Sequence, residues 1–353
     1  MIEERIFEMS SSNERIHGYD VLRVIATFAV IIIHTSTVQL TAAPLNSSGW
    51  QAMIFWDGLA RWAVPLFFML SGALFLPSDK PFPEILKKNC LRIFTAFLFW
   101  SLIYTAISWF TSPEGLGEWK AFLYTWISGH YHLWFCWAIL ALYLLVPLLR
   151  PLARNIKTSR YFLLLALIFA SAVPMLLVVI YYVSPRLCIL GNTVIGKMNM
   201  EFPMGYTGVF VLGCYLAVHA GDRARKPIYI LGIIGAVITP VSAIVLSLIF
   251  GRAITDFYPY LMPNVVFPAA AIFLLLKDFR SRIPGFWKIL SDASFGAYLI
   301  HVLILDAFSR IGFSPLSFSP WISVPLISAA VALVSFTAGA LIRRIPVVGK
   351  YIS

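Results

Sequence analysis

Ten apolar runs, most of them close to twenty residues long, follow one another along this chain of 353 residues. An α-helix of about 20 apolar residues crosses the hydrocarbon core of a membrane, which is about 30 Å thick. Charged residues make up 12% of the chain, against roughly 25% in soluble domains. The alternating strands of a membrane barrel are absent. The sequence therefore predicts an all-α, polytopic membrane protein with about ten transmembrane helices.

No loop between the runs is long enough to separate domains, so we expect a single membrane-embedded domain over residues 1–353. It comprises a cytoplasmic segment 1–20, a ten-helix core 21–342 and a cytoplasmic tail 343–353. The first run follows a charged segment and lacks an A-x-A-like cleavage site, so we expect it to remain as a span. The spans are expected at 21–41, 56–76, 91–110, 132–149, 161–183, 203–219, 228–250, 259–276, 294–312 and 321–342, and the longest loops at 42–55, 111–130 and 184–202.

The distribution of Lys and Arg predicts the topology. With both termini in the cytoplasm, 21 of the 27 Lys and Arg residues fall on the cytoplasmic side, in six groups that begin with Arg5, Arg15 and Arg23. This asymmetry obeys the positive-inside rule. The net charge of +11 is then explained by basic loops that face anionic lipid. We expect membrane lipid as a partner and no nucleic acid.

Arg23 and His34 lie eleven positions apart on the first predicted helix, and the ten residues between them, VIATFAVIII, carry no charge. Helix geometry puts the two side chains about 16 Å apart along the axis and within about 20° around it. If Arg23 marks the membrane boundary, His34 lies near the midplane. An ionisable group is unfavourable there unless it faces a cavity, so His34 is a candidate for function.

Further polar residues fall within or beside the predicted spans. Asp57 and Arg61, at i and i+4, can form a structural ion pair or face a polar cavity. His132 and Trp134 open the fourth span, where an aromatic belt is expected in any case, although the same residue types suit a carbohydrate acceptor. Tyr298 and His301, at i and i+3 on the ninth span, can simply bridge helices.

Basic residues at the cytoplasmic ends of the helices have two possible roles. They can serve topology alone, or they can hold the phosphates of a cytosolic substrate, a task that suits Arg forks and Lys point charges. The residues concerned are Arg23, Lys88, Arg92 and Arg150.

Several common chemistries have no motif in this sequence. Cys90, Cys136, Cys188 and Cys214 form no C-x-x-C pair, so we expect neither a zinc site nor a disulfide framework. The G-x-S-x-G elbow, the P-loop and the H-E-x-x-H helix are also missing. Any reaction must then depend on the membrane histidines, and no metal is expected.

Together the motifs resemble the integral membrane acyltransferase family called acyltransferase 3. They are Y-D-V-L-R-x10-H, R-x-x-V-P-L-F-F-M-L-S-G, K-x3-R-I, Y-H-L-W-F with Y-L-L-x-P-L, and S-F-G-x-Y-x-x-H, in order along nearly the whole chain. Within the family the likeness is strongest to members that O-acetylate enterobacterial common antigen and O-antigens. The resemblance implies ten membrane helices in a bacterial inner membrane, acetyl-CoA as acyl donor and a glycan hydroxyl as acceptor, with Arg23 and His34 matching the family's Arg-x10-His motif.

On this basis His34 is expected to act as a general base or as a transient acyl carrier. Arg23, Lys88, Arg92 and Arg150 are candidates for the donor site. The acceptor, a cell-surface or lipid-linked glycan, is expected to contact Asp57, Arg61, His132 and Trp134, and His301 and Tyr298 are candidates to orient His34. Alternatives are a succinyl donor, a transporter or flippase for an anionic or lipid-linked sugar, and a catalytically silent relative. The oligomeric state is left open.

Overall fold

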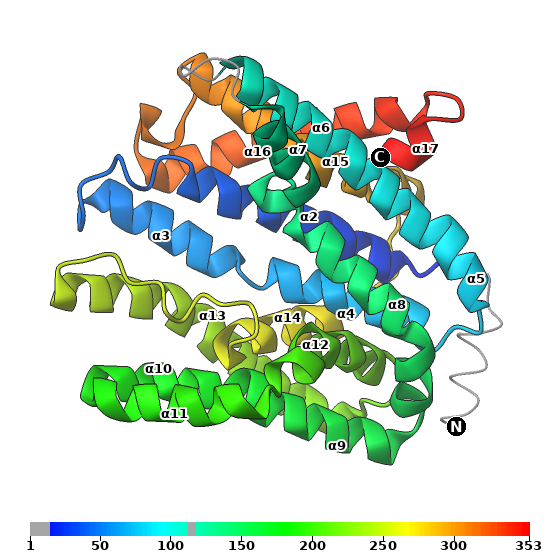
Figure 1. Cartoon of the computed structure of the whole chain (residues 1–353), viewed down its shortest axis with the longest axis vertical. Helices are drawn as coiled ribbons and strands as arrows, with labels where there is room; N and C mark the ends of the chain where they lie inside the picture. The colour runs from blue at the N-terminus through cyan, green and yellow to red at the C-terminus, as the bar shows by residue number, and fades with distance from the viewer. Residues whose placement is uncertain (1–14, 112–117) are drawn as a thin grey trace.

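The computed structural model describes residues 15–111 and 118–353, and within these ranges the chain is helical and has no strand. Arg5 and most of the predicted segment 1–20 lie outside the described residues. Figure 1 shows helices stacked side by side, with α2 and α15 in the upper half and α9 to α11 along the lower edge. The elements of the first half are α2 (His17–Thr37), α3 (Ser48–Ala60), α4 (Ala63–Phe75), α5 (Phe82–Glu84), η1 (Ile85–Cys90), α6 (Leu91–Thr111), α7 (Trp119–Ser128), η2 (Tyr131–Leu133) and α8 (Trp134–Arg154).

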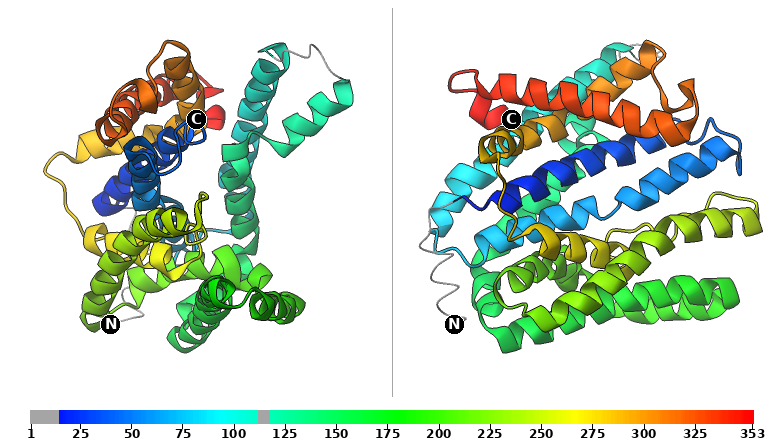
Figure 2. Two further views of the ribbon diagram at one scale, coloured as in Figure 1. Left: turned by 90° about the vertical axis from the view of Figure 1, so that its left-hand side faces the viewer. Right: turned by 180° about the vertical axis from the view of Figure 1, so that it is seen from behind.

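The second half continues with helices on both sides of α2, as the two further views show (Figure 2). Its elements are α9 (Ile156–Ala166), η3 (Leu167–Ala172), α10 (Val173–Val183), α11 (Pro185–Met198), α12 (Glu201–Val218), α13 (Asp222–Phe250), α14 (Pro263–Leu276), α15 (Pro284–Arg310), η4 (Pro315–Ser317), α16 (Pro320–Arg343) and α17 (Gly349–Ile352).

Among the described residues, eight helical segments are long and apolar enough to cross a membrane, or nine if a bent pair counts as one span. This confirms a polytopic helical membrane protein. Each of the ten predicted runs falls on a helix, but two differ from a simple span. The sixth, on α12, forms the bent pair with α11 at an angle of 75°. The eighth, α14, has only 14 residues and so rises about 21 Å, because an irregular stretch precedes Pro263.

Three predicted loops contain helices, and the prediction of simple loops was wrong there. Helix α3 begins at Ser48, whose preceding residue Ser47 accepts a hydrogen bond from the Trp50 amide. Helix α7 lies within 111–130, of which 112–117 are outside the described residues, and α11 occupies most of 184–202. Pro185 opens α11 at a position where its missing N–H is tolerated.

The predicted cytoplasmic residues meet one another at one end of the molecule. Arg15 binds both carboxylate oxygens of Asp20, at 2.6 and 2.8 Å, and also reaches Asp292 on α15. The hydrogen bond that Arg15 donates to Asp20 is the main reason why the pKa of Arg15 is raised. Asp20 thus pairs with a basic group at this mouth. Further pairs at this end join Arg154 to Asp79 and Arg225 to Asp278.

Glycines allow α4 and α12 to pack closely. A methyl group at Gly72 would overlap the carbonyl oxygen of Phe210, and one at Gly213 would overlap that of Met69. Small residues at such crossings bring helix backbones together, which is the main source of packing energy within lipid. The fully buried rings of Phe68 and Phe210 fill the space beside this crossing.

We therefore expect Gly72→Ala to destabilise the protein by about 1–3 kcal/mol, because the added methyl forces the two helices apart. Thermal unfolding of the purified protein in detergent measures the effect. Gly196→Ala is the matched control, since a methyl at this helical glycine meets no atom within 4 Å. Equal melting temperatures for the two variants would contradict the close crossing.

Candidate active site

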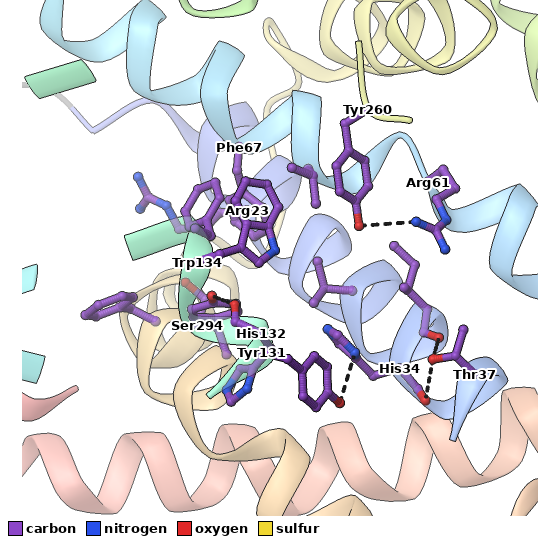
Figure 3. A pocket seen from close by; sticks show the side chains of 16 residues that line it. Arg23, His34, Thr37, Arg61, Phe67, Tyr131, His132, Trp134, Tyr260 and Ser294 are labelled. Atoms are coloured by element: carbon purple, nitrogen blue, oxygen red, sulfur yellow. Dashed lines mark hydrogen bonds between the residues drawn. The ribbon is translucent and has the colours of Figure 1, made fainter. Parts of the chain in front are cut away.

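A cavity of about 320 Å³ lies among α2, the junction of α3 and α4, the start of α8, and α15. Figure 3 shows Arg23, His34 and Arg61 at successive positions around it. Its walls combine aromatic rings with a few polar groups, as is typical of a site for a small ligand. The lining residues are Arg23, Val30, Ile33, His34, Thr37, Arg61, Val64, Phe67, Tyr131, His132, Trp134, Phe135, Tyr260, Ser294, Phe295 and Tyr298.

Helix α2 supplies one wall of this cavity. Arg23, Val30, His34 and Thr37 follow one another at intervals of seven, four and three residues, which is the spacing of a single helix face. Arg23 and His34 therefore face the same space, as their separation of eleven residues predicts. The residues that flank this face of α2 pack against neighbouring helices, and Leu22, Ala26 and Ile31 among them are fully buried.

Imidazole rings from three elements meet at His34. The ring centre of His301 on α15 lies 5.0 Å away, and that of His132 on η2 lies 6.2 Å away. His301 and His132 are themselves 5.4 Å apart. His130, which no sequence argument singled out, extends the cluster, with its Nδ1 atom 2.9 Å from Nδ1 of His132.

The hydrogen bonds of His301 define its protonation. Its Nδ1 atom lies 2.6 Å from the carbonyl oxygen of Tyr298, which can only accept, so Nδ1 carries the proton. Nε2 of His301 is buried and has no hydrogen-bond partner among the described residues. When the ring is neutral, Nε2 therefore carries a free lone pair.

Tyr298 and Tyr131 hold this cluster in place. The Tyr298 hydroxyl donates to the carbonyl oxygen of His132 at 2.5 Å, which ties η2 to α15. The Tyr131 hydroxyl lies 3.4 Å from Nδ1 of His34. This contact leaves Nε2 of His34 for a ligand. Tyr131 belongs to the Y-H-L-W-F motif, which was the available sequence signal for it.

At the end of the cavity near Thr37, Arg61 forms an ion pair with Asp57 at 2.6 Å. Asp57 is only 2% exposed and Arg61 is 18% exposed. The guanidinium lies 4.9 Å from the ring centre of Tyr258 and 5.5 Å from that of Tyr260. Tyr260 in turn stacks on Trp134, with ring centres 5.8 Å apart. The sequence offered little sign of Tyr260, which falls inside the predicted eighth span.

At the opposite end, only one of the four predicted donor-site cations lines the cavity. Arg23 does so, and it donates to the Ser291 hydroxyl at 3.1 Å. Arg92 lies behind Phe295, a lining residue, and binds the carbonyl oxygen of Ser353. Lys88 pairs with Glu84 on the surface. Arg150 binds the carbonyl oxygens of Phe75 and Lys80, so the structure does not gather the four cations around one ligand.

Six of the predicted site residues line the cavity, and three more, His301, Asp57 and Arg92, contact its lining residues. His301 lies behind His34, and Asp57 lies behind Arg61. The cysteines at 90, 136, 188 and 214 are free and buried. Within 15–111 and 118–353, no group of three or more His, Cys, Asp or Glu residues is arranged to hold a metal ion. The six that line the cavity are Arg23, His34, Arg61, His132, Trp134 and Tyr298.

Comparison with protein families shows which family this chain belongs to. A family model described as an acyltransferase domain, Acyl_transf_3, matches residues 16–341. The chain belongs to the acyltransferase 3 family. The match spans α2 to α16 and therefore every residue that lines the cavity. Neither the curated proteins nor the solved structures gave a significant match.

As a member of the acyltransferase 3 family, the protein is a membrane acyltransferase. Acyl transfer requires a nucleophilic or basic side chain within reach of both donor and acceptor. Of the residues around the cavity, His34 lies between the Arg23 end and the Arg61 end. Its position agrees with such a role.

Substitutions of Asp57 and Arg61 should have strongly coupled effects on the free energy of unfolding. Asp57→Asn or Arg61→Gln alone leaves one buried charge without its partner, at a cost of about 3–5 kcal/mol. The double variant removes both charges, so its loss should be smaller than the sum of the two single losses. Unfolding of the four proteins in detergent gives the coupling energy. Additive losses would show that the pair contributes no interaction of its own.

Proposed function

We propose that this acyltransferase is an O-acetyltransferase of the bacterial inner membrane, which moves an acetyl group from acetyl-CoA to a hydroxyl of a cell-surface or lipid-linked glycan. The observation that carries the proposal is the single cavity that contains Arg23, His34 and Arg61. The resemblance to enzymes that modify enterobacterial common antigen and O-antigens supports this choice of acceptor.

His34 serves as the general base in the first of two routes. Its Nε2 atom takes the proton of the acceptor hydroxyl while the hydroxyl oxygen bonds to the acyl carbon. The carbon–sulfur bond of the thioester then breaks, and the leaving thiolate receives the proton from His34. Donor and acceptor are converted to ester and thiol without a net change in protons.

In the second route His34 is a transient acyl carrier. Nε2 attacks the acyl carbon, the carbon–sulfur bond breaks, and the Nδ1 proton of His34 passes to the leaving thiolate, which gives an acyl-imidazole and the thiol. The acceptor hydroxyl oxygen then bonds to the acyl carbon, the carbon–nitrogen bond breaks, and the hydroxyl proton returns to His34. His301 is suited to assist in this route, because its ring centre lies 5.0 Å from that of His34 and its free Nε2 can relay the hydroxyl proton to His34. Both routes require a neutral His34.

Arg23 provides the donor end of the site. No ion pair found among the described residues involves Arg23, and its hydrogen bond is to the neutral Ser291 hydroxyl. Its charge is therefore available to an anionic group of acetyl-CoA, which supplies the activated acyl group as a thioester. Arg92 lies one side chain behind, whereas Lys88 and Arg150 would have to leave their present partners to join it.

The end near Arg61 suits a neutral, hydroxyl-bearing acceptor. Arg61 is balanced by Asp57, and together they present both hydrogen-bond donors and acceptors. Trp134 and Tyr260 add flat aromatic faces for sugar CH groups, and His132 lies nearby in the cluster. This balance also favours acetyl over succinyl, because Arg23 and Arg61 are the only charged residues in the described lining and a succinyl carboxylate would need a further cation.

Replacement of His34 tests the central role. His34→Gln should lower acetyl transfer by about 10²–10⁴-fold, the usual contribution of a general base, while the protein stays folded. The assay supplies acetyl-labelled acetyl-CoA and a membrane glycan extract to purified protein in lipid, and follows both free CoA and labelled glycan. His17→Gln, outside the cavity, is the matched control. Wild-type rates for His34→Gln would overturn the assignment.

Substitutions at the two ends should separate donor from acceptor. Arg23→Gln should raise KM for acetyl-CoA, and Arg61→Gln should raise KM for the glycan at saturating acetyl-CoA. About tenfold is expected for the loss of one charge-assisted hydrogen bond worth about 1.5 kcal/mol. An unchanged KM and kcat for acetyl-CoA in Arg23→Gln would rule out a donor role for Arg23.

A further inference from the structure

A second cavity, of about 170 Å³, lies between α9 with η3 on one side and α12 with α14 on the other. We call it the apolar groove. Apart from Ser171, its lining side chains are hydrocarbon, Met sulfur or no side chain at all. They are Leu163, Ala166, Leu167, Ala170, Ser171, Met204, Gly205, Gly208, Val209, Leu212, Ile228, Leu261, Pro263, Val266, Phe267 and Ala270. A site with this lining can hold only an apolar ligand.

Backbone irregularities on two facing helices produce the groove. The segment Leu167–Ala172 is a π-helical turn, a feature that is often found at functional sites. On the other side, Gly205 leaves helical geometry, with φ −57° and ψ −112°. In lipid a straight, regular pair of helices would close such a gap by packing. The two irregularities keep it open, although nothing in the proposed reaction requires the space.

The groove adjoins the proposed acceptor end of the active-site cavity. Leu261 lines the groove, and the preceding residue, Tyr260, lines the active-site cavity. Gly205 lines the groove, and the next residue, Tyr206, packs on Trp134 with ring centres 5.7 Å apart. The segments at Gly205 and Tyr206 and at Tyr260 and Leu261 therefore run between the two cavities. A molecule with its polar head at Trp134 and its apolar tail in the groove would pass beside these segments.

The groove is also accessible from the membrane. Leu167 lines it and is 42% exposed, and the same face of the molecule presents Leu164 and Ile168 at 52% and 37% exposure. In a bilayer these side chains contact lipid. Figure 1 shows α9 at the lower edge of the molecule, with α12 above it. A hydrocarbon chain can therefore enter sideways from the bilayer without passing through water.

We propose that the apolar groove holds the hydrocarbon chain of a lipid-linked sugar, and that this is the acceptor whose hydroxyl enters the active-site cavity. This inference rests on the proposed function and narrows it from glycans in general to those still attached to a lipid. The sugar stacks at Trp134 and Tyr260, while the hydrocarbon chain lies along Ala170 and Leu167. A polyprenyl phosphate is the probe for this chain. Binding both parts aligns the hydroxyl with His34 and lowers the KM of the lipid-linked acceptor.

Two substitutions of the same kind on one helical segment test this proposal. Leu167→Trp fills the groove, whereas Leu164→Trp places an equal ring on a neighbouring lipid-exposed position that does not line it. We expect Leu167→Trp to raise KM for the lipid-linked acceptor about tenfold, which is the loss of roughly two buried methylene groups. Its KM for acetyl-CoA should not change. Leu164→Trp should leave both constants at their wild-type values.

Binding without turnover separates this inference from the proposed function. Labelled polyprenyl phosphate is titrated into protein in nanodiscs, with phosphatidic acid as competitor, because the two share a phosphomonoester and differ in the chain. We expect saturable binding that phosphatidic acid does not displace and that Leu167→Trp weakens. Displacement by phosphatidic acid would assign the groove to ordinary bilayer lipid and overturn the proposal.

Kinetics with a delipidated acceptor complete the test. If sugar released from its lipid is acetylated with the same KM as the lipid-linked form, the groove is not part of the acceptor site and the inference fails while the acetyltransferase stands. If polyprenyl phosphate binds but no CoA is released with any acceptor, the proposed function fails instead.

Discussion

The active site depends on one constraint, which is that ionisable side chains in a hydrocarbon core need polar surroundings. Arg23 and His34 lie on one face of an otherwise apolar helix, so α2 cannot present that face to lipid. It packs instead toward α4, α8 and α15, each of which contributes polar or aromatic groups to the same cavity. Burial of these residues and formation of the site are therefore the same event.

Hydrogen bonds to the backbone then fix the cluster. Tyr298 reaches the carbonyl oxygen of His132, and His301 is held by the carbonyl oxygen of Tyr298, so three of the residues depend on one another. In a medium without competing water such bonds define side-chain positions well. The result is a rigid group of imidazoles around His34, with one nitrogen of His301 left unpaired.

Charge differs between the two ends of the cavity, and this difference gives the site a direction. Arg61 is neutralised by Asp57, whereas Arg23 has only a hydroxyl partner. An anionic ligand is consequently favoured at the Arg23 end, and a neutral polar one at the Arg61 end. Since α2 runs between the two, a long donor held by one end at Arg23 can extend the roughly 16 Å along the helix to His34. The apolar groove lies beside the Arg61 end. The two ends therefore differ in their apolar surroundings as well as in their charge.

The sequence by itself determined the features that depend on the spacing of residues within one helix. The apolar runs, the shared face of Arg23 and His34, and the ion pair of Asp57 with Arg61 all follow from helical periodicity and the thickness of a membrane. Tertiary structure alone decided that His301, His132 and Tyr260 meet at this cavity, that Lys88 and Arg150 bind elsewhere, and that α12 and η3 leave helical geometry opposite each other. Such contacts join residues far apart in the chain, and they depend on how side chains of several helices fill the space between them, which no local pattern encodes.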